Sequence, residues 1–169
     1  HAVWMASGEY VLFLDSDDFL DPKIIEKCIK HFSDDIHLVY TNHIKVSADG
    51  KKVVHERDKL IYQRLHEKFK NTVFDPLLHC TFIFHCQIMR RNEFIKLGGW
   101  RTDLGYGDEV DMHLRISELS LEMNFALVPE ALYYYRDNPY SIVHKPDLYK
   151  KLIANIECII VETAQRRGF

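Results

Sequence analysis

The sequence lacks the features of several protein classes. No apolar run approaches the roughly 18 residues of a membrane span, so we expect no transmembrane segment. The net charge of -3 gives no basic footprint, which argues against nucleic acid as a partner. Four cysteines in 169 residues do not make a disulfide scaffold. Seven glycines and five prolines exclude collagen-like and linker-like chains.

What is present is typical of a globular protein. Apolar residues make up 47% of the chain and charged residues 28%, and the length suits a single domain over residues 1–169. Cys28 and Cys158 fall within apolar helical stripes, which favours buried, reduced thiols. Reduced thiols favour a cytoplasmic location. The inner face of the membrane is the other location that we consider. An apolar strand begins so early that its neighbours must precede the chain. We therefore expect a C-terminal portion of a larger domain, whose exposed strand promotes self-association.

Apolar runs alternate with helical patterns, which indicates the α/β class. Residues 10–14 are apolar throughout and predict a central strand buried on both faces. Residues 37–46 predict a second strand, and Pro129 separates two short strands over 124–128 and 131–135. An amphipathic C-terminal helix is expected over residues 147–166.

An acidic cluster, Asp15-Ser16-Asp17-Asp18, follows the first strand. Crowded carboxylates repel one another, and Mg²⁺ relieves this repulsion by using one or two carboxylates plus substrate phosphates. Ligands of open α/β sheets also bind beyond the C-terminal ends of strands. Two other interpretations remain. The cluster could be a solvated turn before the next helix, or a phosphohydrolase site with Asp15 as nucleophile, although Phe19 then occupies a position typical of Thr or Val.

A second acidic group, Asp108-Glu109-Val110-Asp111, opens a predicted helix. Acids in a first turn complement the helix dipole, so a purely structural role explains them equally well. Asp111 and Arg115 are spaced as an i,i+4 pair, which we expect on the solvent side. The preceding Gly105-Tyr106-Gly107 lets backbone and ligand come close, which favours a functional role.

Two further groups are weaker. Residues 133–138 consist of an aromatic strand followed by Arg136, Asp137 and Asn138. This arrangement is suited to binding an anion or the face of a sugar. An ordinary strand with an exposed arginine explains it equally well. His79-Cys80 and His85-Cys86 have the residue types of a zinc site. On a strand, however, their side chains point to different faces, so zinc is disfavoured.

Four segments, taken in order, resemble the motifs of family 2 glycosyltransferases of the GT-A fold. Residues 6–18 (ASGEYVLFLDSDD) are similar to that family's A-x-G-E-Y-hydrophobic-D-S-D-D segment. Leu97-Gly98-Gly99-Trp100 resembles its aromatic-ended Gly-Gly element, and residues 108–115 resemble its acidic helix. Tyr135-Arg136 with Ser141 resembles its Y-R-x-H-x-x-S segment. The resemblance spans most of residues 2–144.

The resemblance implies a partial GT-A fold, nucleotide-diphospho-sugar transferase-like, with a mixed sheet flanked by helices. It also implies transfer of a sugar from a nucleotide-sugar donor to a hydroxyl of a glycan or lipid-linked acceptor, with inversion and with Mn²⁺ or Mg²⁺. Such enzymes build cell-surface polysaccharide. The alternative within the same family is a degenerate, non-catalytic module that binds a partner or glycan.

The same resemblance implies roles for individual residues. Glu109 would be the catalytic base, with Asp108 beside it, although the pair is reversed relative to the family's Glu-Asp. Asp17 and Asp15 would hold the metal. Asn138 stands where the family has a metal-binding His, so His144 is the expected substitute. The substrate-binding residues would be Asp15, Asp18, Gly99, Trp100, Arg136 and Asn138.

Overall fold

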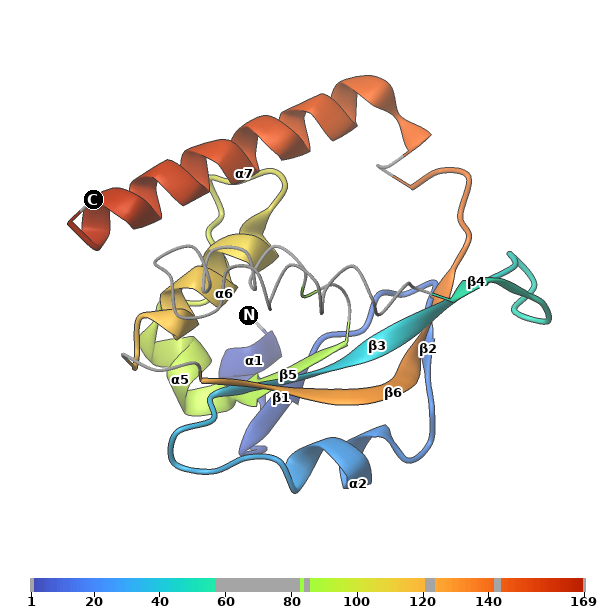
Figure 1. Cartoon of the computed structure of the whole chain (residues 1–169), viewed down its shortest axis with the longest axis horizontal. Coiled ribbons are helices and arrows are strands. Elements are labelled where there is room, and N and C mark those ends of the chain that lie inside the picture. The colour runs from blue at the N-terminus through green and yellow to red at the C-terminus, as the bar shows by residue number, and fades with distance from the viewer. Residues whose placement is uncertain (1, 57–82, 84–85, 121–123, 142–143, 169) are drawn as a thin grey trace.

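A computed structural model of the chain describes residues 2–56, 83, 86–120, 124–141 and 144–168, and it has one mixed sheet with helices on both faces (Figure 1). The charged stretch from Arg57 to Asn71, expected as a loop and a short helix, lies outside the described residues. So do three members of the disfavoured zinc group, His79, Cys80 and His85.

The sheet has the strand order β1-β5-β3-β6-β2, and β4 pairs with the end of β3. Among the strands that the structure describes, β3 and β6 pair in parallel, and the other pairs are antiparallel. The strands are β1 (Tyr10–Leu12), β2 (Phe19–Leu20), β3 (Leu38–Val46), β4 (Val53–Glu56), β5 (Gln87–Arg90) and β6 (Phe125–Arg136). The predicted strand at residues 37–46 is therefore confirmed as β3.

Two strand predictions were wrong in detail. β1 is not central: within the described part of the chain it lies at the edge of the sheet, and Leu14, beyond its end, is exposed. Pro129 does not divide β6, because the strand accommodates it in a bulge where the pairing skips from Val128 to Ala131. The side-chain amide of Asn42 donates to the Pro129 carbonyl at 2.7 Å and satisfies that irregular backbone.

The helices divide between the two faces of the sheet (Figure 1). α2 (Ile24–Ile29) lies on one side, while α1 (Ala2–Met5), α5 (Arg91–Lys96), α6 (Asp108–Ser117) and α7 (Pro146–Arg166) lie on the other. α2 is preceded by a turn in which the Asp21 side chain accepts a hydrogen bond from Lys23 N at 2.8 Å.

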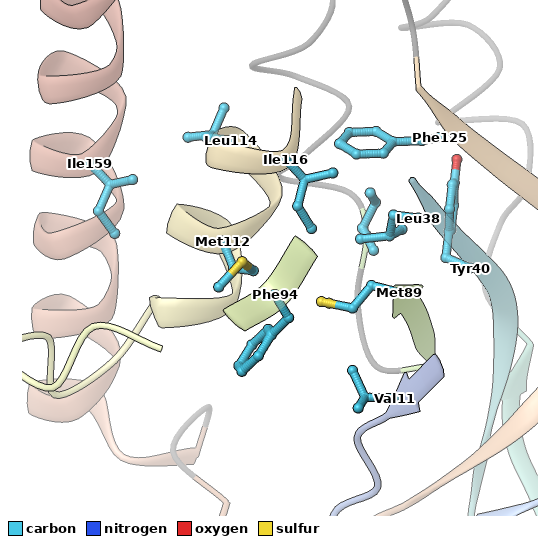
Figure 2. Packing of buried hydrophobic residues seen from close by; sticks show 11 residues of the cluster. Val11, Leu38, Tyr40, Met89, Phe94, Met112, Leu114, Ile116, Phe125 and Ile159 are labelled. Atoms are coloured by element: carbon cyan, nitrogen blue, oxygen red, sulfur yellow. The ribbon is translucent and has the colours of Figure 1, made fainter. Parts of the chain in front are cut away.

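Each face of the sheet carries its own apolar core. On the α2 side, Ile24 and Cys28 pack against Val39, Ile88 and Tyr133. On the other side, Phe94, Met112 and Ile116 from the helices meet Leu38 and Met89 from the strands (Figure 2). Ile159 extends this second core to α7, which packs on α6. The core thereby fixes α6 relative to the ends of the strands.

Two of the three described cysteines are buried, and the third is not. Burial raises the pKa of Cys28 to about 11 and that of Cys86 to about 12. Cys158 is exposed, contrary to the expectation for its helical stripe. Across the helices that the structure describes, none is long and apolar enough to span a membrane.

Candidate active site

The acidic cluster forms a tight turn after β1, closed by a hydrogen bond from Asp18 N to the Asp15 carbonyl at 3.1 Å. The Asp18 carboxylate ties this turn to β6. It accepts one hydrogen bond from the Tyr133 hydroxyl at 2.6 Å and another from Arg136 N at 2.8 Å. Asp18 therefore sets the position of the turn through β6.

Asp17 is held by the residues that follow β6. Asn138 Nδ2 donates to Asp17 Oδ2 at 2.7 Å. Arg136 Nε donates to the Asp17 carbonyl at 2.5 Å, and its Nη1 donates to the Ala48 carbonyl at 2.8 Å. The Arg136 guanidinium also lies over the Phe19 ring, 5.5 Å from its centroid. The structure thus brings together Asp17, Arg136 and Asn138, with the Arg136 guanidinium engaged by the turn itself.

Asp15 is the member of the cluster whose carboxyl is most affected by its surroundings. Burial raises the pKa of its carboxyl, and the negative charges of Asp18 and Asp17 raise it further. A divalent cation stabilises such crowded carboxylates and shares its remaining coordination with donor phosphates. The donor set of Asp15 and Asp17 therefore fits Mg²⁺ or Mn²⁺ bound through one or two protein oxygens.

His144 does not join this donor set. Its ring lies against Asp137, with Nε2 3.6 Å from Oδ1, and Asp137 is also paired with Lys45 at 2.7 Å. Throughout the described part of the chain, no three His, Cys, Asp or Glu side chains converge in a way that could hold a metal. A metal at the acidic turn would therefore depend on the substrate for several of its ligands.

The second acidic group begins α6, and α7 fixes its start. Gly107 precedes the helix with a φ of 85°, in the left-handed region that favours glycine. A Cβ atom at Gly107 would lie 3.4 Å from Ile156 and 3.5 Å from Ile159 of α7. Asn155 of α7 donates from Nδ2 to the Tyr106 carbonyl at 3.0 Å. The residue at the helix cap is therefore Gly107, not Asp108.

Glu109 lies near enough to the acidic turn for the charge of Asp15 to affect its carboxyl. Burial raises the pKa of its carboxyl to about 7, with further contributions from the charges of Asp108 and Asp15. Gln87 of β5 opposes the rise through its side-chain amide. The helix dipole was expected to keep Glu109 ionised, but burial and the neighbouring acids outweigh it. A carboxyl with a pKa near 7 is suited to accept and release protons.

Asp108 is also half-buried. Burial raises the pKa of its carboxyl, and the backbone N–H groups of Asp108 and Glu109 act in the opposite direction. Asp108 therefore interacts with the N-terminus of α6, as expected of an acid in this position.

Asp111 and Arg115 form the expected i,i+4 pair, but not on the solvent side. Asp111 is 1% exposed, and its Oδ2 accepts a hydrogen bond from Arg115 Nε at 2.8 Å. Arg115 also donates to the carbonyls of Leu97 and Gly99, the latter at 2.8 Å. Asp111 is buried because the Gly-Gly turn packs against α6, where Arg115 bridges the two segments by hydrogen bonds.

The Gly-Gly element packs as part of an aromatic cluster. Trp100 contacts Phe13 and Phe94, with ring centroids 4.7 and 5.1 Å apart. Gly99 has a φ of 71°, and a Cβ atom there would lie 2.4 Å from the Trp4 ring. Gly99 and Trp100 thus connect the segment after β1 with α5 and α6.

Sequence reasoning missed two residues that shape this site. Tyr133 was seen only as part of an aromatic run, yet its hydroxyl binds Asp18. Gln87 was not singled out, although it is 1% exposed and lies next to Glu109. A glutamine within the apolar strand pattern of residues 81–89 was the available signal.

Curated relatives match part of the chain. It is 43% identical over 120 residues to a chondroitin synthase and to a hyaluronan synthase of Pasteurella multocida, and 27% identical over 120 residues to a chondroitin synthase of Escherichia coli. Each match covers 70% of this chain. It covers 11% of each Pasteurella protein and 16% of the Escherichia coli protein. The chain therefore corresponds to a small part of the relatives that it matches.

Solved structures share the fold at low sequence identity. Glucosyl-3-phosphoglycerate synthase of Mycobacterium tuberculosis aligns with a TM-score of 0.57 at 16% identity, over 94% of this chain and 52% of its own. TarS of S. aureus aligns with a TM-score of 0.54 at 16% identity, over 95% of this chain and 43% of its own. The expected GT-A fold, a mixed sheet flanked by helices, is confirmed.

The family model for glycosyl transferase family 2 matches residues 1–98, which include the acidic turn. With the 43% identity to the Pasteurella relatives, this match shows that the chain belongs to glycosyl transferase family 2.

Proposed function

We propose that this chain is the C-terminal portion of a GT-A domain that transfers a sugar from a nucleoside diphosphate donor to an acceptor hydroxyl, with inversion. The observation that carries the proposal is the proximity of Glu109 to Asp15, which is close enough for the charge of Asp15 to raise the Glu109 pKa. Residues from the turn after β1 and from the start of α6, which are distant in sequence, thus lie close enough to interact. The acidic turn offers carboxylates to a cation, and the start of α6 offers a proton acceptor.

Asp17 and Asp15 are the residues that would hold Mn²⁺ or Mg²⁺. The Mycobacterium tuberculosis synthase was solved with Mn²⁺ and UDP and also with Mg²⁺ and UDP, which supports the same ions here. The bound ion would stabilise negative charge on the departing diphosphate. Asn138 holds the Asp17 carboxylate in place for this role.

Glu109 is the proposed general base. An acceptor hydroxyl is a weak nucleophile, and a carboxylate beside it takes up its proton as the new bond forms. Attack on the face opposite the diphosphate then inverts the anomeric centre. Burial gives Glu109 a pKa near 7, which lets it take the proton and later release it to solvent. Asp108 supports this by raising the Glu109 pKa.

The remaining residues would shape the donor pocket. Asp18 and Arg136 maintain the turn that carries Asp17, and Gly99 and Trp100 form an adjoining wall. The acceptor is a glycan, and the names of the relatives point to a polysaccharide of the chondroitin or hyaluronan kind. We place such synthesis in the cytoplasm or at the inner face of the membrane.

The test uses the natural protein that contains this chain. UDP release is measured from a panel of UDP-sugars with chondroitin and hyaluronan oligosaccharides as acceptors, first with EDTA and then with Mn²⁺ restored. We expect release that requires Mn²⁺ and acceptor, and a product of inverted anomeric configuration by NMR. Retained configuration would refute the inverting mechanism.

Two other outcomes identify the alternatives. Mn²⁺-dependent UDP binding without transfer to any acceptor would indicate the non-catalytic module. A phosphoryl group trapped on Asp15 would indicate the phosphohydrolase, which family membership disfavours.

A further inference from the structure

A buried polar pair lies behind Glu109. His113 is on α6, one turn after Glu109, and it is completely buried, while Gln87 on β5 is 1% exposed. A ring nitrogen of His113, Nε2, hydrogen-bonds to Gln87 Oε1. An amide oxygen only accepts hydrogen bonds, so His113 carries a proton on Nε2. The pair thereby links the helix that bears Glu109 to the sheet.

This bond fixes which way the Gln87 amide faces. With Oε1 bound to His113, the other amide atom is the nitrogen, and it is the donor that acts on Glu109 to lower its pKa. Gln87 Nε2 is fully buried and makes no hydrogen bond of normal geometry to any residue in the described part of the chain. A buried amide donor without a partner loses its hydrogen bonds to water without replacing them, so the arrangement requires an explanation.

We propose that Gln87 is a positioning residue for Glu109, with its amide oriented by His113; this inference rests on the proposed function. Gln87 Nε2 donates to one Glu109 oxygen and leaves the other directed at the acceptor hydroxyl. Hydrogen bonds between catalytic groups are often long until substrate binds and then tighten. A buried Gln87 amide nitrogen without a partner, near enough to Glu109 to affect its charge, is the arrangement expected of a bond that forms in the reacting complex.

The chain contains a matched control. Asn124 is also 1% exposed, and its Nδ2 donates to the Ile116 carbonyl at 2.7 Å, while its Oδ1 has no hydrogen bond among the described residues. Asn124 lies at the opposite end of α6 from Glu109. If the loss of any buried amide lowered activity, substitution of either residue would lower it. If Gln87 positions the base, only substitution of Gln87 should.

The kinetic test compares Gln87→Met and Asn124→Leu in the natural protein, with Mn²⁺ and the best UDP-sugar. Gln87→Met should lower kcat at least about tenfold, with donor KM and Mn²⁺-dependent UDP affinity unchanged. Asn124→Leu should leave the kcat of the folded protein unchanged. Gln87→Glu keeps the shape and an acceptor for His113 but removes the donor, and it should also lower kcat. A kcat within twofold of wild type in folded Gln87→Met or Gln87→Glu would overturn the proposal.

A second measurement does not depend on turnover. In the complex with Mg²⁺ and UDP, NMR coupling across the hydrogen bond between the Gln87 amide nitrogen and the Glu109 carboxyl carbon should be detectable. It should disappear in His113→Phe, where the amide loses its anchor. Absence of coupling in the wild-type complex would overturn the positioning role. Coupling in a protein that transfers no sugar would refute the proposed function while retaining the Gln87–Glu109 bond.

Discussion

The acidic turn and the start of α6 present carboxylates to one site, but their surroundings differ. At the turn, Asp17 and Asp18 accept hydrogen bonds from Asn138, Tyr133 and Arg136 N. At α6, Glu109 is partly buried near two other acids, and within the described part of the chain the Gln87 side chain favours its charged form. The first region holds its oxygens in fixed positions, while the second makes its carboxyl easy to protonate.

The difference separates two chemical tasks. A cation ligand must be an oxygen held at a defined place, which hydrogen bonds from a neighbouring strand achieve. A proton acceptor instead needs a pKa near the working pH, which burial and like charges achieve. Asp15 interacts electrostatically with both Asp17 and Glu109, and it couples the two regions.

The sharpest test of this comparison is Glu109→Gln, in which the base loses its charge but keeps its shape. Transfer should fall by about 10²–10⁴-fold, while Mn²⁺-dependent UDP affinity is unchanged because the acidic turn is intact. Asp108→Asn is the control and should leave turnover near that of wild type without a loss of stability, because burial already disfavours the Asp108 charge. Near-normal turnover in Glu109→Gln combined with loss in Asp108→Asn would assign the base to Asp108. The measurements are initial rates and calorimetric UDP binding.

The same substitution tests the burial of Glu109 through pH. An unfolded glutamate ionises near pH 4.5, whereas the folded carboxyl has a pKa of about 7. In the metal-free protein this group favours folding fully below pH 4.5 and loses that contribution as the pH rises through 7. Glu109→Gln should therefore match wild type at pH 4 and exceed its unfolding free energy at pH 8 by at most about 3 kcal/mol. Equal stability at both pH values, in urea denaturation, would show that Glu109 is not electrostatically destabilised.

Much of the fold was predictable because its signals are local. The apolar pattern of residues 37–46 and the helical stripe of 147–166 produced β3 and α7 nearly as expected. The edge position of β1 was not predictable, because a continuous apolar run does not reveal which strands pair with it. The bulge at Pro129 depends on Asn42, which is distant in sequence and satisfies the Pro129 carbonyl.

The features of the candidate site also divide into those that local sequence predicts and those that depend on tertiary packing. Asp17 and Glu109 lie in sequence motifs, so their importance could be predicted. The burial of Asp111 could not, because it depends on Arg115 reaching the Gly-Gly turn. Nor could the sequence reveal that Gln87 lies behind Glu109, since β5 and α6 meet only through tertiary packing.

A smaller effect is expected at the acidic turn. Asp17→Asn removes the negative charge and retains one amide oxygen, so Mn²⁺-dependent UDP binding should weaken at least about tenfold, or about 1.4 kcal/mol. Asp21→Asn is the matched control, because Asp21 only accepts a hydrogen bond from Lys23 N before α2. Its UDP affinity should equal that of wild type. Equal metal-dependent binding in Asp17→Asn would remove Asp17 from the metal site.

The smallest effect concerns the hydrogen bonds that tie the turn to β6. Tyr133→Phe removes the donor to Asp18 and should lower the unfolding free energy by about 1 kcal/mol. Tyr134→Phe is the control: its ring stacks on Phe19 at 4.7 Å, and its hydroxyl has no hydrogen bond within the described residues. Because Asp18 positions the turn that carries Asp17, Tyr133→Phe should also weaken Mn²⁺-dependent UDP binding, while Tyr134→Phe should not. A stability loss of the same size in both variants would show that the Tyr133 hydroxyl is dispensable, and that backbone contacts such as Arg136 N to Asp18 are enough to hold the turn.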